Sequence, residues 1–238
     1  MIEASLNYLR DGDDALVTVL IGGVLLLASP LLIPAFAVLG YVTRVLRRTA
    51  DGDDEPPVFD AWGELLVDGL KAFAVTFVYS LVPLAVLGTA VAFGIGAALI
   101  GSTDGGLLGG LAGGIVALAL TLVALAASLA GVYVTPAAVA AVADSGRVGD
   151  GFALGTLWGV VSKGAYGRGW LAAAAVGFAG ALAIGVLSVV PILGTIAGLF
   201  VQFYALVAAA AIIGRTWADV RPVATDADDV DPIERPAV

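Results

Sequence analysis

The fold is decided by residues 107–142, LLGGLAGGIVALALTLVALAASLAGVYVTPAAVAAV, which contain no Asp, Glu, Lys or Arg. Residues 15–50, 69–143 and 169–218 are almost as poor in ionisable groups. Each run is longer than the roughly 20 apolar residues with which a helix crosses a bilayer. None alternates between apolar and polar residues as the strands of a transmembrane β-barrel do. The sequence therefore predicts an all-α, polytopic transmembrane helical bundle.

The composition agrees with a membrane protein and offers little material for catalysis. Hydrophobic residues make up 60% of the chain and charged residues 13%, against about 45–50% and about 25% in soluble domains. Cys and His are absent, which excludes disulfides, thiol catalysis and thiolate or imidazole metal ligands. No acid or base lies deep inside an apolar run, and no hydrolase or nucleotide motif stands in a suitable context. We therefore expect no enzyme, no catalytic residues, no cofactor and no metal.

The net charge of −9 is carried mostly by Asp. Sixteen of the twenty acids are Asp, and only two of the eleven bases are Lys, at Lys71 and Lys163. Acid-rich, lysine-poor loops are typical of a protein that faces concentrated salt, as in a halophile, although a GC-rich genome gives a similar composition. The acidic balance also argues against nucleic-acid binding, which requires clustered Lys and Arg.

Six apolar segments, arranged as three helical hairpins, are expected within a single integral membrane domain of residues 1–217. Pro83 and Pro136 lie inside segments longer than a straight crossing requires, which predicts a tilt, a kink or a partial break. Residues 218–238 are rich in acids and prolines, and we expect them to form a disordered cytoplasmic tail. The approximate ranges of the six segments are 15–29, 31–48, 69–100, 107–142, 169–190 and 192–217.

The basic residues predict the orientation. With six segments, all eleven bases fall on one side, and the opposite turns, at residues 29–34, 101–106 and 189–192, contain none. The positive-inside rule then places both termini in the cytoplasm of a multi-pass protein of the cell membrane. The first segment is only about 22 Å long, against a hydrocarbon core of ~30 Å. Residues 16–43 could instead form one kinked crossing, which gives five crossings and leaves only Arg10 on the wrong side.

Two amphipathic stretches are expected to lie as short helices in the membrane interface. In residues 59–68, Phe59 and Trp62 fall on the helical arc opposite Asp60. A second stretch, residues 151–166, is also rich in aromatic and aliphatic side chains. Aromatic residues of this kind favour the depth of the lipid headgroups.

Small residues recur every four positions and line single helix faces. Such faces let another backbone approach closely. They predict packing within the chain or a flexible outer turn, with contact to a second copy or another membrane protein as the alternative. The three sets are Gly105, Gly109 and Gly113; Gly106, Gly110 and Gly114; and Ala173, Gly177, Ala181 and Gly185.

Polar residues near or within the apolar segments admit a structural and a functional interpretation. Arg44, with Arg47 and Arg48, is expected to anchor a span end, paired with residues 51–55 and with lipid headgroups. Together with Tyr41, Arg44 could instead bind a phosphate or carboxylate. Four further side chains could join helices or line a path through the membrane. They are Gln202 and, on one face of the third segment, Thr76, Tyr79 and Ser80.

Four stretches within about residues 16–75 form a recognisable pattern. They are Leu32-Ile33-Pro34-Ala35-Phe36, Gly40-Tyr41 with Arg44, Asp54-Glu55-Pro56-Pro57-Val58-Phe59-Asp60-Ala61-Trp62-Gly63, and Val67-Asp68-Gly69-Leu70-Lys71-Ala72-Phe73. In these stretches the chain resembles archaeal, haloarchaeal-type multi-spanning membrane proteins of unknown function. The resemblance implies a membrane location, an archaeal origin and a halophilic host, and it implies no activity.

The leading hypothesis for function is a non-enzymatic accessory, scaffold or envelope component that works through helix contacts and membrane lipids. Packing glycines without any buried charge motivate it. The alternative is a permease or lipid-handling transporter, because Pro83 predicts irregular backbone at membrane depth. An enzyme would have to draw its acids from loop residues such as Asp54, Glu55 and Asp60, which more simply hydrate the surface.

Overall fold

A computed structural model describes residues 2–10, 14–101 and 106–222, and these residues contain helices and turns but no strand. The prediction of an all-α protein is confirmed for this part of the chain. Its helices are α1 (Ile2–Asn7), α2 (Ala15–Leu27), α3 (Ile33–Ala50), α4 (Trp62–Gly101), α5 (Gly106–Ser145), α6 (Leu154–Val161), α7 (Gly164–Leu187) and α8 (Leu193–Val220), with the 3-10 turns η1 (Ser29–Leu31) and η2 (Val148–Phe152).

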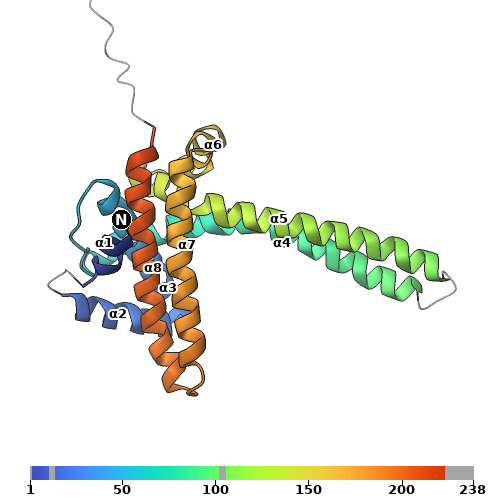
Figure 1. Ribbon diagram of the computed structural model, residues 1–238, viewed down its shortest axis with the longest axis horizontal. Helices are drawn as coiled ribbons and strands as arrows, with labels where there is room; N and C mark the ends of the chain where they lie inside the picture. The colour runs from blue at the N-terminus through green and yellow to red at the C-terminus, as the bar shows by residue number, and fades with distance from the viewer. Residues whose placement is uncertain (1, 11–13, 102–105, 223–238) are drawn as a thin grey trace, which may run out of the picture.

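Two long helical hairpins dominate the shape of the molecule (Figure 1). The α4–α5 hairpin extends away from the α7–α8 hairpin at a wide angle, and α1 and α2 lie on the other side of α8. Four helices, α4, α5, α7 and α8, are long and apolar enough to cross a membrane. With 40 residues each, α4 and α5 are about 60 Å long.

The core lies where the two hairpins meet, around α3 and the part of α8 from Phe203 to Val220. Tyr41, Val45, Phe203 and Ile212 are completely buried there. The crossing of α3 and α4 depends on two glycines, because a Cβ on Gly40 would lie 1.9 Å from the Leu65 carbonyl oxygen. A Cβ on Gly69 would lie 1.8 Å from the carbonyl oxygen of Phe36. Only glycine allows the two backbones to approach this closely.

The structure corrects the first of the two interfacial helices. Residues 59–68 do not form a separate helix, because α4 begins at Trp62 and continues without interruption to Gly101. No residue near Asp68 ends the helix. Gly69 does not form a turn; it lies inside α4 and lets the backbone of α3 approach closely at Phe36. The second stretch is separate, as predicted: Gly146, at φ 72°, ends α5, and η2 and α6 precede α7.

Each of the six predicted segments contains a helix, but their bounds differ from the prediction. In the first segment, helix α2 has only 13 residues. In the second segment, helix α3 contains three arginines. Neither helix is therefore among the four candidate spans. Pro83 and Pro136 lie inside continuous helices and do not break them. The predicted tail begins too early, since α8 continues to Val220; residues 223–238 lie outside the described residues.

Candidate functional site in the groove between the hairpins

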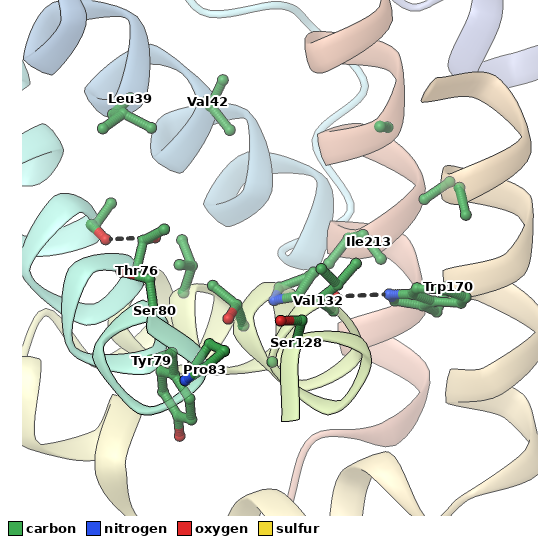
Figure 2. Close-up of a pocket in the computed structure, with 18 of the residues that line it drawn as sticks. Leu39, Val42, Thr76, Tyr79, Ser80, Pro83, Ser128, Val132, Trp170 and Ile213 are labelled. Carbon is green, nitrogen blue, oxygen red and sulfur yellow. Dashed lines mark hydrogen bonds between the residues drawn. The ribbon is translucent and has the colours of Figure 1, made fainter. Parts of the chain in front are cut away.

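An apolar groove of about 910 Å³ lies between the two hairpins, where α3, α4, α5, α7 and α8 meet (Figure 2). Its volume is within the ~300–1,000 Å³ that is usual for small-molecule sites. Leu39 and Val42 contribute from α3, Pro83 from α4, Val132 from α5 and Ile213 from α8. No residue that lines the groove carries a charge.

Five hydroxyl groups of the groove are turned back onto their own helices. Thr43 donates to the Leu39 carbonyl at 2.8 Å, and Thr76 donates to that of Ala72 at 2.9 Å. Ser80, Thr121 and Ser128 make the same kind of bond, at 2.7, 2.8 and 2.8 Å, to carbonyls three or four residues earlier. These donors are therefore already used, and the walls present hydrocarbon and oxygen lone pairs.

Pro136 fixes one wall of the groove to α7. Because proline has no N–H, the carbonyl of Val132, four residues earlier, loses its helical donor. The Trp170 indole N–H donates to this carbonyl at 3.1 Å (Figure 2). One turn away, the Tyr166 hydroxyl donates to the Tyr133 carbonyl at 2.8 Å, and the Tyr133 hydroxyl donates to the carbonyl of Val161 at 2.8 Å. The proline site is thus fixed by three side-chain hydrogen bonds.

The wall formed by α4 contains the polar face that the sequence singled out. Thr76, Tyr79 and Ser80 all line the groove beside Pro83 (Figure 2). The Tyr79 hydroxyl donates to the carbonyl of Gly151 at 3.0 Å, so it joins α4 to η2. These hydroxyls therefore connect backbone groups, which agrees with the structural interpretation. Gln202 is exposed on α8 and is not part of the groove.

Comparison with protein-family models gives one match, to "Protein of unknown function (DUF4013)", over residues 23–189. The match extends from α2 to the turn after α7 and includes most of the groove.

The chain belongs to the DUF4013 family.

The match confirms the predicted resemblance to a family of unknown function and extends it well beyond residues 16–75. Four apolar helices support membrane insertion of this DUF4013 protein. The chain matches no curated protein and no solved structure.

Arg44 of the DUF4013 protein holds the loop that precedes α4 through hydrogen bonds to Asp60 and Ala61. Its guanidinium donates to the carboxylate and carbonyl of Asp60 at 2.8 and 3.0 Å, and to the Ala61 carbonyl at 3.2 Å. Ala61 has a φ of 45°, a conformation that these contacts help to hold. Tyr41 is fully buried and stacks on Phe59, with ring centroids 4.4 Å apart. The arrangement favours the anchoring interpretation of Arg44 over an anion site shared with Tyr41.

The acidic loop after α3 is tied to the far end of the chain. Arg215 binds Asp54 at 2.7 Å, and Arg221 binds Asp51 at 3.5 Å and Asp144 at 3.0 Å. The predicted pairing of the α3 arginines with residues 51–55 holds for Arg48, which binds Asp53 at 3.7 Å. We name this set of ion pairs the charged end. The predicted pairing is wrong for Arg44 and Arg47, which bind Asp60 and Asp68 at 2.8 and 3.7 Å. Sequence reasoning missed the contributions of α8, because nothing local relates residues about 160 positions apart.

The small-residue faces are packed only in part. A Cβ on Gly113 would lie 2.5 Å from the Ala97 Cβ, so this glycine serves the α4–α5 contact within the chain. No atom lies within 4 Å of the Cβ position of Gly106, Gly114, Gly177 or Gly185. Gly105 lies outside the described residues. Among the described residues, no group of three or more acidic side chains is arranged to hold a metal ion.

Proposed function

We propose that this DUF4013 protein is a non-enzymatic component of the cell envelope that binds hydrocarbon chains of membrane lipids in the groove between its hairpins. The observation that carries the proposal is a groove of about 910 Å³ with uncharged walls. Five of its lining hydroxyls donate to carbonyls of their own helices. A hydrocarbon chain has no polar group that needs a hydrogen-bond partner, so it can be buried against such walls without a desolvation penalty.

The same chemistry argues against a path for polar solutes. A permeating ion or sugar requires donors, acceptors or charges that replace its water. The indole N–H of Trp170, which lines the groove, is already bonded to the carbonyl of Val132. Gln202, the one glutamine in the chain, lies outside the groove. A permease is therefore the weaker of the two predicted functions.

A cytoplasmic location of both termini is part of the proposal. At the charged end, ion pairs bring arginines from α3 and from the C-terminal end of α8 close to Asp144 at the end of α5. The positive-inside rule places such a cluster of basic residues on the cytoplasmic face of the membrane. Trp62 and Trp158, 46% and 73% exposed, are suited to the interface. An even number of crossings follows, which the six-segment prediction also has.

An accessory role in contact with other membrane proteins, or with a second copy, is compatible with lipid binding. The unpacked glycines on α7, Gly177 and Gly185, would allow a second helix to approach. Affinity purification from native membranes should then recover a constant partner. A protein that is consistently isolated alone, at monomer size, would remove this part of the proposal.

The acidic composition supports a further part of the proposal, a halophilic archaeal host. The net charge is −9, and its self-repulsion is screened within about 3 Å at 1 M salt. The purified protein should melt at a higher temperature in molar KCl than in dilute buffer. A melting temperature that falls with added salt would contradict this part.

Lipid binding is tested with phospholipids that carry a photoactivatable group on the acyl chain. In native membranes they should label peptides from the groove. Ser128→Trp fills the groove and should reduce this labelling several-fold. The matched control is Leu129→Trp, at a neighbouring side chain that is 64% exposed and outside the groove. Equal labelling of groove peptides in the two variants would contradict lipid binding.

A further inference from the structure

The first two apolar helices are too short to cross a bilayer. With 13 residues, α2 is about 20 Å long. In α3, only residues 33–43 precede Arg44, and these eleven residues span about 16 Å. Both lengths are well below the ~30 Å of the hydrocarbon core. A hairpin of this size reaches into the bilayer but falls short of the opposite surface.

The turn between these helices exposes an apolar surface that is suited to the hydrocarbon region of a bilayer. Leu31, Leu32 and Ile33 are 73%, 62% and 65% exposed, so three aliphatic side chains point outward together. The turn contains no charged or amide side chain. If the turn reached water on the far side of the membrane, these aliphatic side chains would be exposed to solvent. The free-energy cost would be about 25 cal/mol per Å² of apolar surface.

Part of the backbone of the turn meets the requirement that lipid imposes on buried N–H groups. The N–H groups of Ala28, Leu31 and Leu32 donate within the turn, to the carbonyls of Val24, Ala28 and Ser29, at 2.9, 3.0 and 2.9 Å. The Ser29 hydroxyl donates to the Leu25 carbonyl at 3.0 Å. The turn also contains Pro30, which has no N–H to satisfy. In the hydrocarbon region an unsatisfied backbone group is costly, and these hydrogen bonds reduce that cost.

The contacts between α2 and α8 indicate how deeply α2 lies in the bilayer. Gly22 and Gly23 lie against the rings of Phe203 and Phe200 of α8. From Phe200, α8 continues for seven residues, about 10 Å, to its start at Leu193. Figure 1 likewise shows α2 crossing α8 before the α7–α8 turn is reached. The outward face of α2 is apolar, with exposed side chains at Leu16, Leu20, Val24 and Leu27.

We infer that α2, η1 and the first half of α3 form a re-entrant hairpin, which enters and leaves the bilayer on the side of the charged end. Its outer face and turn bind the hydrocarbon chains of membrane lipids. The four candidate spans, α4, α5, α7 and α8, are then left for the crossings. This inference concerns topology and stands whether or not the groove binds lipid.

The absence of cysteine from the chain permits a direct test with single-cysteine variants in native membranes. Leu31→Cys probes the turn, and Asp53→Cys probes the charged end. Ser102→Cys, in the connection after α4, probes the opposite side. An impermeant maleimide is applied to intact cells and to inverted vesicles, and total thiol is measured after denaturation.

The inference predicts that Leu31→Cys reacts from neither side and reacts fully after denaturation. Asp53→Cys should react only in inverted vesicles and Ser102→Cys only in intact cells. The buried thiol should react at least about tenfold more slowly than either control, because water and charged reagents are excluded from the bilayer. Leu27→Cys, at a lipid-facing position 54% exposed, should behave as Leu31→Cys does.

Two results would overturn the inference. Reaction of Leu31→Cys in intact cells, at the rate of Ser102→Cys, would show that the hairpin crosses completely. Reaction in inverted vesicles, at the rate of Asp53→Cys, would show that it lies on the membrane surface. If Leu31→Cys fails to accumulate, Leu27→Cys decides between the same outcomes.

Discussion

The α4–α5 hairpin and helix α8 have similar hydropathy and very different surroundings. In its most apolar window α8 is 44% buried inside the protein, whereas the corresponding windows of α4 and α5 are 11% and 6% buried. Away from the core, α4 and α5 pack mainly on each other through small residues such as Ala97 and Gly113. Apolar composition therefore identifies the spans, but it does not tell which of them are covered by protein and which by lipid.

The centre of α8 shows how the difference arises. Phe203 contacts Tyr41 at a centroid distance of 5.5 Å, and it also lies against Gly22 of α2. Val207, Ala211 and Ile212 are completely buried. By contrast, Leu108, Ile115 and Leu118 of α5 are 82%, 67% and 61% exposed. Substitutions should therefore have large effects near α3 and α8 and small ones along the α4–α5 hairpin.

The largest effect is expected at the crossing of α3 and α4. Gly40→Ala places a Cβ against the Leu65 carbonyl oxygen and must separate the two backbones. Overpacking of this kind costs about 1–3 kcal/mol, and more where backbone cannot move. The folded fraction in detergent should fall sharply, as measured by the melting temperature. The control is Gly88→Ala, at a position with no atom within 4 Å; an equal loss there would contradict the comparison.

The next effect is expected at the buried arginine that holds the loop before α4. Arg44→Ala removes three hydrogen bonds to Asp60 and Ala61. Hydrogen bonds to charged groups are worth about 1.5–3 kcal/mol, so we expect a loss of about 2 kcal/mol in unfolding free energy. Arg168→Ala, at an exposed arginine, should change it by less than about 0.5 kcal/mol. Equal stability of the two variants would show that the loop is held elsewhere.

A smaller effect is expected where Trp170 replaces the missing donor of Pro136. Trp170→Phe should cost about 1 kcal/mol, because the Val132 carbonyl loses its partner. Pro136→Ala supplies a backbone N–H to the same carbonyl. In that background Trp170→Phe should cost less, and a double-mutant cycle of melting free energies measures the difference. A purely additive cycle would contradict this account of the proline site.

The smallest effect concerns α1 and alkaline pH. Burial raises the pKa of the Tyr8 hydroxyl above its ordinary value, and the hydroxyl donates to the Glu55 carbonyl at 3.1 Å. Because the folded pKa is the higher one, this contribution is complete below pH about 10 and is lost as the pH rises further. Amide exchange in α1 should therefore accelerate above that pH. Tyr8→Phe should abolish the alkaline step, and its persistence would contradict the assignment.

Local pattern predicted much of the fold. Each apolar run coincides with a helix, although the bounds differ and four of these helices are candidate spans. The continuity of α4 through Asp68 did not follow, because the role of Gly69 depends on a backbone 33 residues earlier, at Phe36. The wide angle between the hairpins was likewise inaccessible, since it is set by the α3–α4 crossing and by α8.

The groove was predictable only in pieces. The sequence singled out Thr76, Tyr79 and Ser80, and the structure places them in one wall. Pro136 predicted a tilt, kink or partial break, and the bond from Trp170 to the Val132 carbonyl could not be foreseen because Trp170 is 38 residues from Val132 and on another helix. Gln202 was expected to join helices or to line a path, but its position in the middle of a span does not reveal which face of the helix carries it.

The central claim is that lipid covers the α4–α5 hairpin, in contrast to the protein-covered α8. A nitroxide attached to Leu118→Cys of α5, in reconstituted vesicles, tests it most directly by its collisions with oxygen and with a water-soluble nickel complex. The account predicts high accessibility to oxygen and low accessibility to nickel. High accessibility to nickel at Leu118 would place the hairpin in water and contradict the account.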